Sequence, residues 1–244
     1  MTSGARVRWL GQAGFEISSP AGVKVAIDPY LGDSCMDLVG FKRMMPAPVS
    51  IEEFSADALL ISHEHPDHLD IDLLRSICEK GGDMPVYGND ACRKSLEDAG
   101  LDPQRMTRIG IGDRFAVGDI EVEAVACDHG VQCVEPLGFM LRVGGVRVYF
   151  AGDTAYSPEM LKAVTEMGAD VALLPINGMY GNLDSEQAVR LAMDMGCKTL
   201  IPCHFWTFVE HGGNPLWLKQ YMDESPEVKV VFLAPGECFG LDWE

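Results

Sequence analysis

The segment His63-Glu64-His65-Pro66-Asp67-His68 decides how the rest of the sequence is interpreted. It holds three of the six histidines in a chain of 244 residues. Residue frequencies place the pattern H-x-H-x-D-H in such a chain by chance only about 3 times in 10,000. A plain surface turn uses Gly, Asn or Pro rather than three imidazoles. Because neutral imidazoles and a carboxylate are the ligands of divalent transition metals, the segment predicts a metal site.

The spacing within this segment predicts two metal positions. His63 and His65 alternate, so both point to one side of an extended segment, whereas Asp67 and His68 follow a proline that turns the chain. An apolar run at residues 58–62 predicts a buried strand before the segment, and residues 70–79 predict a helix after it. The segment therefore lies on a strand-to-helix turn, where open α/β sheets gather functional groups.

The sequence also contains an internal repeat. Residues 14–28 match residues 138–153, since each segment contains a strand, a turn with glycine and a second strand that ends on an aspartate. Residues 56–60 then match residues 169–174 in the same order. This pattern predicts a duplicated unit of hairpin, strand and helix, with two sheets packed face to face and helices outside. The alternative is a chance similarity between common strand patterns.

Other elements follow ordinary signals. The sequence predicts helices from Ser157-Pro158 to Gly168, from Asp184 to Gly196 and from Asn214-Pro215 to Tyr221, and strands at residues 171–174, 199–201 and 229–233. No linker or low-complexity segment separates the two halves, so residues 1–244 are expected to form a single domain.

Three more polar residues stand at the ends of expected strands. His129 follows the strand at residues 120–126, Asp153 ends the strand at residues 147–150, and His204 follows the strand at residues 199–201. This shared placement makes all three candidates for the same metal site.

Composition limits the partners. The chain has 19 Lys and Arg against 37 Asp and Glu, a net charge of −18, which disfavours binding to nucleic acid or to an anionic membrane and favours a small-molecule substrate. There is no signal-peptide segment and no apolar run long enough to span a membrane, so a cytoplasmic protein is expected. The eight cysteines form no C-x-x-C pair and are expected to be free thiols. The sequence leaves the oligomeric state open between a monomer and a homo-oligomer.

The motif at residues 63–68 resembles the signature of the metallo-β-lactamase superfamily, and the later candidates follow in the order of that superfamily's motifs. The resemblance implies an α/β fold, an αββα sandwich of two mixed β-sheets flanked by helices. It implies a dinuclear site with His63, His65 and His129 on one metal ion, Asp67, His68 and His204 on the other, Asp153 bridging both, and Asp28 fixing a ligand imidazole.

Residues 41–48, 175–178, 182–184, 201–205 and 235–237 are similar to the branch that includes ascorbate-6-phosphate lactonase, although that enzyme is longer. Asn177 lies in one of these motifs and is a candidate for substrate binding. The mixed imidazole and carboxylate donors suit zinc, iron or manganese, and the branch favours manganese or zinc.

This site predicts a hydrolase. A hydroxide held between two divalent metal ions is a strong nucleophile, and the metals polarise the substrate oxygen. Asp67 would orient the water, take its proton or only bind metal, and His204 would pass a proton to the leaving group. The expected reaction is the opening of a small lactone or ester, phosphorylated and other anionic ones included. The alternatives are a metal-dependent phosphodiesterase and a redox or regulatory protein that uses the metals without hydrolysis.

Three further residues are expected on the substrate side. Lys42 and Arg43 follow Phe41 in a long connection which, by the resemblance, covers the cleft, and two adjacent cations predict an anion clamp. An exposed basic pair is the alternative. His211 lies in a loop that leaves the candidate ligand His204 and should border the cleft, with an ordinary surface histidine as the alternative.

Overall fold

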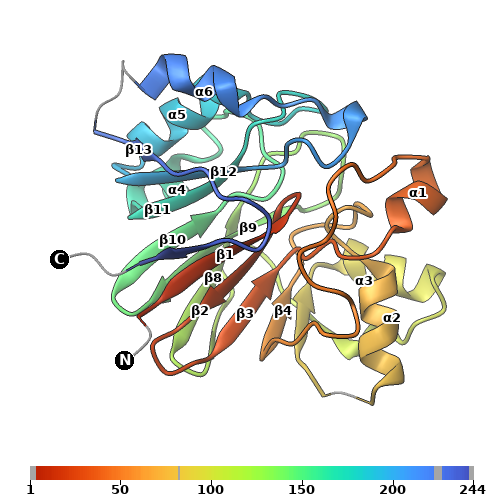
Figure 1. Cartoon of the computed structure of the whole chain (residues 1–244). Helices are drawn as coiled ribbons and strands as arrows, with labels where there is room; N and C mark the ends of the chain where they lie inside the picture. The colour runs from red at the N-terminus through yellow and green to blue at the C-terminus, as the bar shows by residue number, and fades with distance from the viewer. Residues whose placement is uncertain (1–3, 82, 223–226, 242–244) are drawn as a thin grey trace.

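Two seven-stranded β-sheets form the centre of the fold, and helices lie outside them (Figure 1). The computed structural model describes residues 4–81, 83–222 and 227–241. Both sheets contain parallel and antiparallel pairs. The predicted fold class, two mixed sheets flanked by helices, is therefore confirmed.

The first sheet has the strand order β14-β1-β2-β3-β4-β5-β6. Its strands are β1 (Arg6–Gly11), β2 (Gly14–Ser18), β3 (Lys24–Ile27), β4 (Ala58–Leu60), β5 (Val86–Gly88), β6 (Met106–Arg108) and β14 (Cys238–Gly240). The strands from β14 to β3 pair antiparallel, and those from β3 to β6 pair parallel.

The second sheet has the strand order β13-β12-β11-β10-β9-β8-β7. Its strands are β7 (Arg114–Val117), β8 (Ile120–Ala126), β9 (Leu137–Val143), β10 (Val146–Phe150), β11 (Val171–Pro175), β12 (Thr199–Cys203) and β13 (Lys229–Val230). The strands from β7 to β10 pair antiparallel and those from β10 to β13 pair parallel. This is the same succession as in the first sheet, as the predicted duplication requires. One strand is exchanged, because β14 from the C-terminal part of the chain takes the place in the first sheet that β7 has in the second.

The helices are short, and the side chain of Asp70 caps the one that follows residues 63–68. They are α1 (Ser34–Val39), α2 (Ile71–Glu79), α3 (Asp90–Asp98), α4 (Lys162–Met167), α5 (Ser185–Asp194) and α6 (Pro215–Met222), with 3-10 turns at Pro103–Arg105 and Val209–His211. The carboxylate of Asp70 accepts hydrogen bonds from the backbone N–H groups of Asp72 and Leu73 and also from those of Leu31 and Gly32. Asp70 therefore ties the start of α2 to the connection after β3.

Two expected elements have different bounds. Helix α4 begins at Lys162 rather than at Ser157, because residues 158–161 form a turn that the hydrogen bond from Leu161 N–H to the carbonyl of Ser157 closes. Strand β13 contains only Lys229 and Val230, since the pairing with β12 covers only these two residues.

The two sheets pack against each other through one continuous apolar core. The ring of Phe150 lies 6.3 Å from that of Phe15, which belongs to the first sheet, and 6.3 Å from that of Phe139. All eight cysteines are free. Within the described residues, no helix has the length and apolar character that crossing a membrane requires.

Candidate metal centre

The candidate metal ligands come from four loops that follow strands of both sheets. The turn after β4 carries His63, His65, Asp67 and His68, while single ligands follow β8, β10 and β12. The structure brings the seven predicted ligands together in overlapping groups, within each of which donor atoms lie no more than 4.8 Å apart. These groups are His63, His65, His129 and Asp153; Asp67, His68 and His204; and Asp28, His63 and His68.

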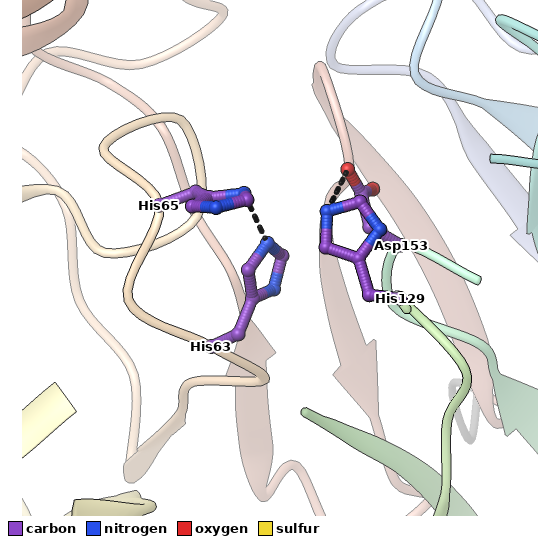
Figure 2. A group of neighbouring side chains, drawn as sticks. All are labelled: His63, His65, His129 and Asp153. Carbon is purple, nitrogen blue, oxygen red and sulfur yellow. Dashed lines mark hydrogen bonds and ion pairs between the residues drawn. The ribbon is translucent and has the colours of Figure 1, made fainter. Parts of the chain in front are cut away.

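We call the group of His63, His65, His129 and Asp153 the first position. Figure 2 shows His63 and His65 on one side, facing His129 and Asp153 on the other. Nε2 of His63 lies 3.0 Å from Nδ1 of His65, and Nε2 of His129 lies 3.8 Å from Oδ2 of Asp153. His65 is half-buried and its Nε2 lies 3.1 Å from the carbonyl oxygen of Gln132. This position therefore borders the loop that contains Gln132.

We call the group of Asp67, His68 and His204 the second position. Nε2 of His204 lies 3.3 Å from Nε2 of His68 and 3.2 Å from Oδ2 of Asp67. Oδ1 of Asp153 lies 3.2 Å from Nε2 of His68 and 3.1 Å from Nε2 of His204. The two oxygens of Asp153 thus face different positions, which is the arrangement a bridging carboxylate needs.

The donor atoms fit a metal. Neither ring nitrogen of His129 has a hydrogen-bond partner among the described residues, although both are sealed from solvent. A buried polar atom without a partner costs about 1–3 kcal/mol, so such atoms call for a function. In addition, two pairs of imidazole nitrogens converge at 3.0 and 3.3 Å. Imidazole nitrogens and carboxylates that converge on shared points are the ligand set of zinc, iron or manganese.

Asp28 supports this centre from the end of β3. It is fully buried and its Oδ2 lies 2.7 Å from Nδ1 of His68, while its Oδ1 accepts a hydrogen bond from the backbone N–H of Ser62 at 2.8 Å. The hydroxyl of Ser62 also contacts Oδ2 of Asp28. A carboxylate on the far nitrogen of a ligand imidazole fixes its orientation and tautomer. Asp28 thereby turns Nε2 of His68 toward the second position.

Comparison with known proteins agrees with this geometry. A model of the β-lactamase superfamily domain matches residues 24–205. A UPF0173 metal-dependent hydrolase of Hyperthermus butylicus is 31% identical over 240 residues, which cover 96% of this chain and 98% of that protein. The chain belongs to the metallo-β-lactamase superfamily. Within that superfamily it is a metal-dependent hydrolase of the UPF0173 family.

Two solved structures show the same metallo-β-lactamase fold. Igni18, a metallo hydrolase from Ignicoccus hospitalis, has a TM-score of 0.77 at 24% identity, and the match covers 98% of this chain and 99% of that one. An isothiocyanate hydrolase from Delia radicum gut bacteria has a TM-score of 0.76 at 18% identity, with 97% and 98% covered.

The metal-free second position is strongly charged. Burial opposes the charge on His68 and His204, but Asp153 and Asp67 outweigh it, so that the pKa of His68 is raised well above 6.5 and the pKa of His204 is raised to about 9. Burial would raise the pKa of both carboxyl groups, yet the nearby imidazoles hold the pKa of Asp67 and of Asp153 well below 3.8. Without metal, protons on the two imidazoles of this protein thus supply positive charge where a bound metal ion would supply it.

The first position has the opposite character. Burial, helped by neighbouring imidazoles, lowers the pKa of His63 well below 6.5 and lowers the pKa of His129 to about 4, although Asp153 raises both. These imidazoles are therefore neutral at neutral pH and their lone pairs are free for a metal.

Arg43, which with Lys42 forms the predicted anion clamp, makes contacts within its own loop. The guanidinium of Arg43 donates hydrogen bonds to the carbonyl oxygens of Tyr30 and Gly32 at 2.9 and 2.8 Å, and it lies 4.2 Å above the ring of Tyr30. Arg43 therefore binds the start of the same connection between β3 and β4 in which it lies. Lys42 is exposed on the surface. The geometry gives Arg43 structural contacts, and the anion clamp stays a prediction.

The two other predicted substrate-side residues lie close to the second position. His211 is buried rather than on the surface, and its ring stacks on that of His204 with centroids 4.8 Å apart. Asn177 is also buried and packs against Gly213. A Cβ at Gly213 would lie 2.8 Å from Cβ of Phe205 and 3.1 Å from Cα of Asn177, and φ is +75°, so only glycine allows this approach.

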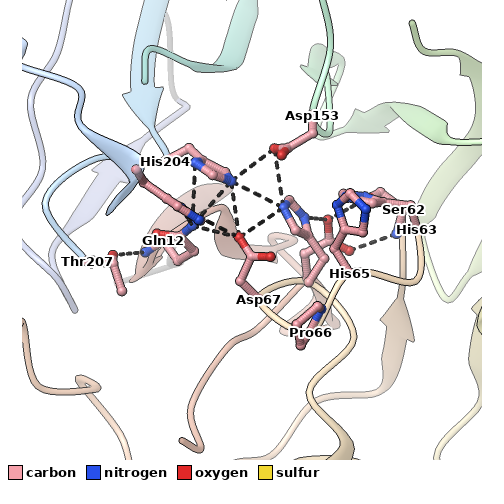
Figure 3. Close-up of polar contacts among 12 residues, drawn as sticks. Gln12, Ser62, His63, His65, Pro66, Asp67, Asp153, His204 and Thr207 are labelled. Atoms are coloured by element: carbon pink, nitrogen blue, oxygen red, sulfur yellow. Dashed lines mark hydrogen bonds and ion pairs between the residues drawn. The ribbon is translucent and has the colours of Figure 1, made fainter. Parts of the chain in front are cut away.

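Sequence reasoning missed Gln12. This residue is fully buried in the turn between β1 and β2, and its Nε2 donates a hydrogen bond to Oδ2 of Asp67 at 2.8 Å (Figure 3). It also contacts His204 and His211. A polar residue in a hairpin turn carries no sequence signal beyond its place in the turn, because contacts with residues 55 to 199 positions away are visible only in the fold.

Proposed function

We propose that this metal-dependent hydrolase opens a small lactone or hydrolyses a small ester, and that it uses two divalent ions, manganese or zinc. The observation that carries the proposal is Asp153, whose two oxygens face the two positions at 3.1–3.8 Å from three imidazoles. Seven converging donors exceed the four that one tetrahedral ion takes. When bound, such ions supply Lewis-acid polarisation of the substrate oxygen and a water nucleophile of lowered pKa.

The chain's own residues divide the proton transfers. Hydrolysis of an ester needs an acceptor for the proton of the attacking water and a donor for the leaving oxygen. Asp67 is the acceptor in this proposal, because Gln12 fixes its carboxylate and His204 lies 3.2 Å from Oδ2. The predicted relay through His204 would need Nε2, the nitrogen that faces the second position, so Asp67 itself returns the proton to the leaving oxygen.

The surroundings of the second position favour a small, partly apolar substrate. A small apolar cluster of Tyr30, Cys35 and Phe208, with Phe41 packed on it, covers this side of the centre. Rings of Phe41 and Phe208 lie 5.5 and 4.9 Å from that of His211. The net charge of −18 opposes a nucleic acid as substrate. We also propose that the protein works in the cytoplasm, which the eight free cysteines support.

The test is a substrate comparison with protein reconstituted with manganese or with zinc. We expect hydrolysis of lactones and carboxylic esters at least about 100-fold faster than hydrolysis of phosphodiesters, and loss of both on chelation. The control is Asp153→Asn loaded with the same metal. A preference for phosphodiesters would replace the proposal by the phosphodiesterase alternative, and activity that persists in Asp153→Asn would remove the centre from the reaction.

A further inference from the structure

Gln12 is held in place by its backbone. It lies in the left-handed region with φ of +48°, which costs a residue other than glycine about 1 kcal/mol or more. Its N–H donates to the hydroxyl of Thr207 at 3.2 Å, and its carbonyl oxygen accepts from Nε1 of Trp9 at 3.0 Å and from the backbone N–H of His204 at 2.9 Å. Such contacts from both sheets keep the strained turn and aim the side chain at the metal centre.

The orientation of the Gln12 amide follows from its neighbours. Nε2 lies 2.8 Å from Oδ2 of Asp67 and 2.9 Å from Nδ1 of His211. The reverse orientation would set Oε1 against the carboxylate of Asp67, two acceptors with no proton between them. The two protons on Nε2 are therefore given to Asp67 and to His211.

This hydrogen bond determines where His211 carries its proton. An amide nitrogen has no lone pair and can only donate, so Nδ1 of His211 must accept. An imidazole that accepts at Nδ1 is neutral and has its proton on Nε2. Among the described residues, Nε2 of His211 has no hydrogen-bond partner, and it is not one of the nitrogens sealed from solvent without one. Its proton is therefore available to a ligand.

The ring of His211 cannot easily turn away from this arrangement. It stacks on His204 at an interplanar angle of 12°, and the rings of Phe41, Phe208 and Tyr180 surround it at 5.5, 4.9 and 5.6 Å. The imidazole of His211 is thus fixed beside the metal ligand His204. It offers no lone pair to a metal, because its lone pair, on Nδ1, accepts the hydrogen bond from Gln12.

We infer that Gln12 is a positioning residue that holds His211 as the Nε2–H tautomer, and that His211 donates this N–H to an oxygen of the bound substrate next to the second position. The inference rests on the proposed function, which it deepens. It predicts substrates with an acceptor oxygen at or beside the scissile carbonyl. A neutral donor held in place stabilises developing negative charge on such an oxygen without transferring a proton.

The first experiment reads the tautomer directly, without any catalysis. Metal-free protein is labelled with ¹⁵N at histidine, the signals of His211 are assigned by their loss in His211→Phe, and long-range ¹H–¹⁵N correlation spectra identify the protonated nitrogen. We expect Nε2–H in the wild type. In Gln12→Glu a carboxylate faces Nδ1, so we expect a proton on Nδ1. Wild-type His211 protonated on Nδ1, or a Gln12→Glu spectrum identical to that of the wild type, would overturn the inference.

The second experiment separates the donor from the ring. His211→Phe keeps the stacking on His204 and removes the donor, whereas His211→Gln keeps an N–H at a similar distance from the backbone. With equal metal content in both, we expect kcat/KM for a lactone to fall by about 100-fold in His211→Phe and to recover by at least about tenfold in His211→Gln. Equal losses in both variants would overturn the assignment of His211 as a donor.

Two controls keep these outcomes distinct. Thermal unfolding of the metal-free variants shows whether each one folds, and Gln12→Glu, which keeps the size of the side chain, stands beside Gln12→Ala. If wild-type protein hydrolyses neither lactone nor ester, the proposed function fails, while the tautomer spectra still decide whether Gln12 sets the proton of His211.

Discussion

The two candidate metal positions share Asp153 but are built differently. In the first position His63 and His129 are neutral, their pKa values lowered by burial, and the half-buried His65 borders the Gln132 loop. In the second position every ligand is buried and held by a further residue, since Asp28 fixes His68 and Gln12 fixes Asp67.

This difference separates two ways of preparing a metal site. In the first position the neutral His63 and His129 carry no extra proton that a metal would have to displace, and Ser62 Oγ lies 2.8 Å from Nδ1 of His63. The second position is preorganised, but in the metal-free state two imidazolium groups face two carboxylates, so a metal must displace protons. The comparison teaches that rigidity and readiness for metal are not the same property.

The largest expected effect comes from the residue that the two positions share. Asp153→Asn keeps the shape of the side chain but removes the charge that faces both positions, so kcat should fall about 1,000-fold or more. Steady-state kinetics with elemental analysis measure this. A variant that loses metal from only one position would show that Asp153 belongs to that position alone.

Proton release on metal binding should distinguish the two positions next. At pH 7 we expect the second position to release about two protons, from His68 and His204, and the first position almost none. Titration calorimetry in buffers of different ionisation enthalpy measures the number. His129→Ala isolates the second position and His204→Ala removes most of it. Equal release from both variants would break the comparison.

The free energy of unfolding of the metal-free protein should fall toward both alkaline and acidic pH, because the two positions respond to pH in opposite ways. His204, with its pKa raised from 6.5 to about 9, contributes stability that is complete below pH 6.5 and is lost as the pH rises through 9. His129, with its pKa lowered from 6.5 to about 4, makes the unfolded chain bind a proton first, so stability falls as the pH drops from 6.5 toward 4.

Urea unfolding across this range tests both slopes in single variants. His204→Asn should reduce only the alkaline slope, to which His68 also contributes, and His129→Asn only the acidic slope, to which His63 also contributes. A wild-type profile that stays flat between about pH 5 and pH 9 would contradict the assigned protonation of both positions.

The smallest effect concerns the connection that covers the second position. Arg43→Ala removes two hydrogen bonds to backbone carbonyls and the contact with Tyr30, so the free energy of unfolding should fall by about 1–3 kcal/mol. The neighbouring variant Lys42→Ala is the matched control and should leave stability unchanged, because Lys42 is exposed. A rise in KM for anionic substrates alone, without loss of stability in Arg43→Ala, would restore the predicted anion clamp.

The sequence allowed the fold and the metal ligands to be predicted because both leave local signals. The pattern of His63, His65, Asp67 and His68 is dense enough to be specific. The two hairpins that end on Asp28 and Asp153 predict the duplication and the two-sheet fold. Strand ends also carry position information, since residues that follow parallel strands meet at one edge of a sheet.

The remaining parts of the site depend on contacts that no local pattern encodes. Gln12 matters because a strained turn meets the loop of Thr207, and the contacts of Arg43 arise because the carbonyl oxygens of Tyr30 and Gly32 lie within its reach. The same holds for His211, whose surroundings come from three separate segments, at Gln12, Phe41 and His204. Whether a polar side chain faces substrate or protein is decided by tertiary packing.

The exchanged strand β14 has a consequence for protein synthesis. Residues 236 and 237 bond the backbone of Trp9 on both its N–H and C=O groups, and β14 closes the edge of the first sheet at β1. A nascent chain on the ribosome therefore holds β1, and with it the turn of Gln12, at an open sheet edge until nearly all of these 244 residues have emerged. Until residues 236–240 have been synthesised, β1 lacks the strand that pairs with its outer edge, and Trp9, which binds the carbonyl oxygen of Gln12, lacks both backbone hydrogen bonds to this segment.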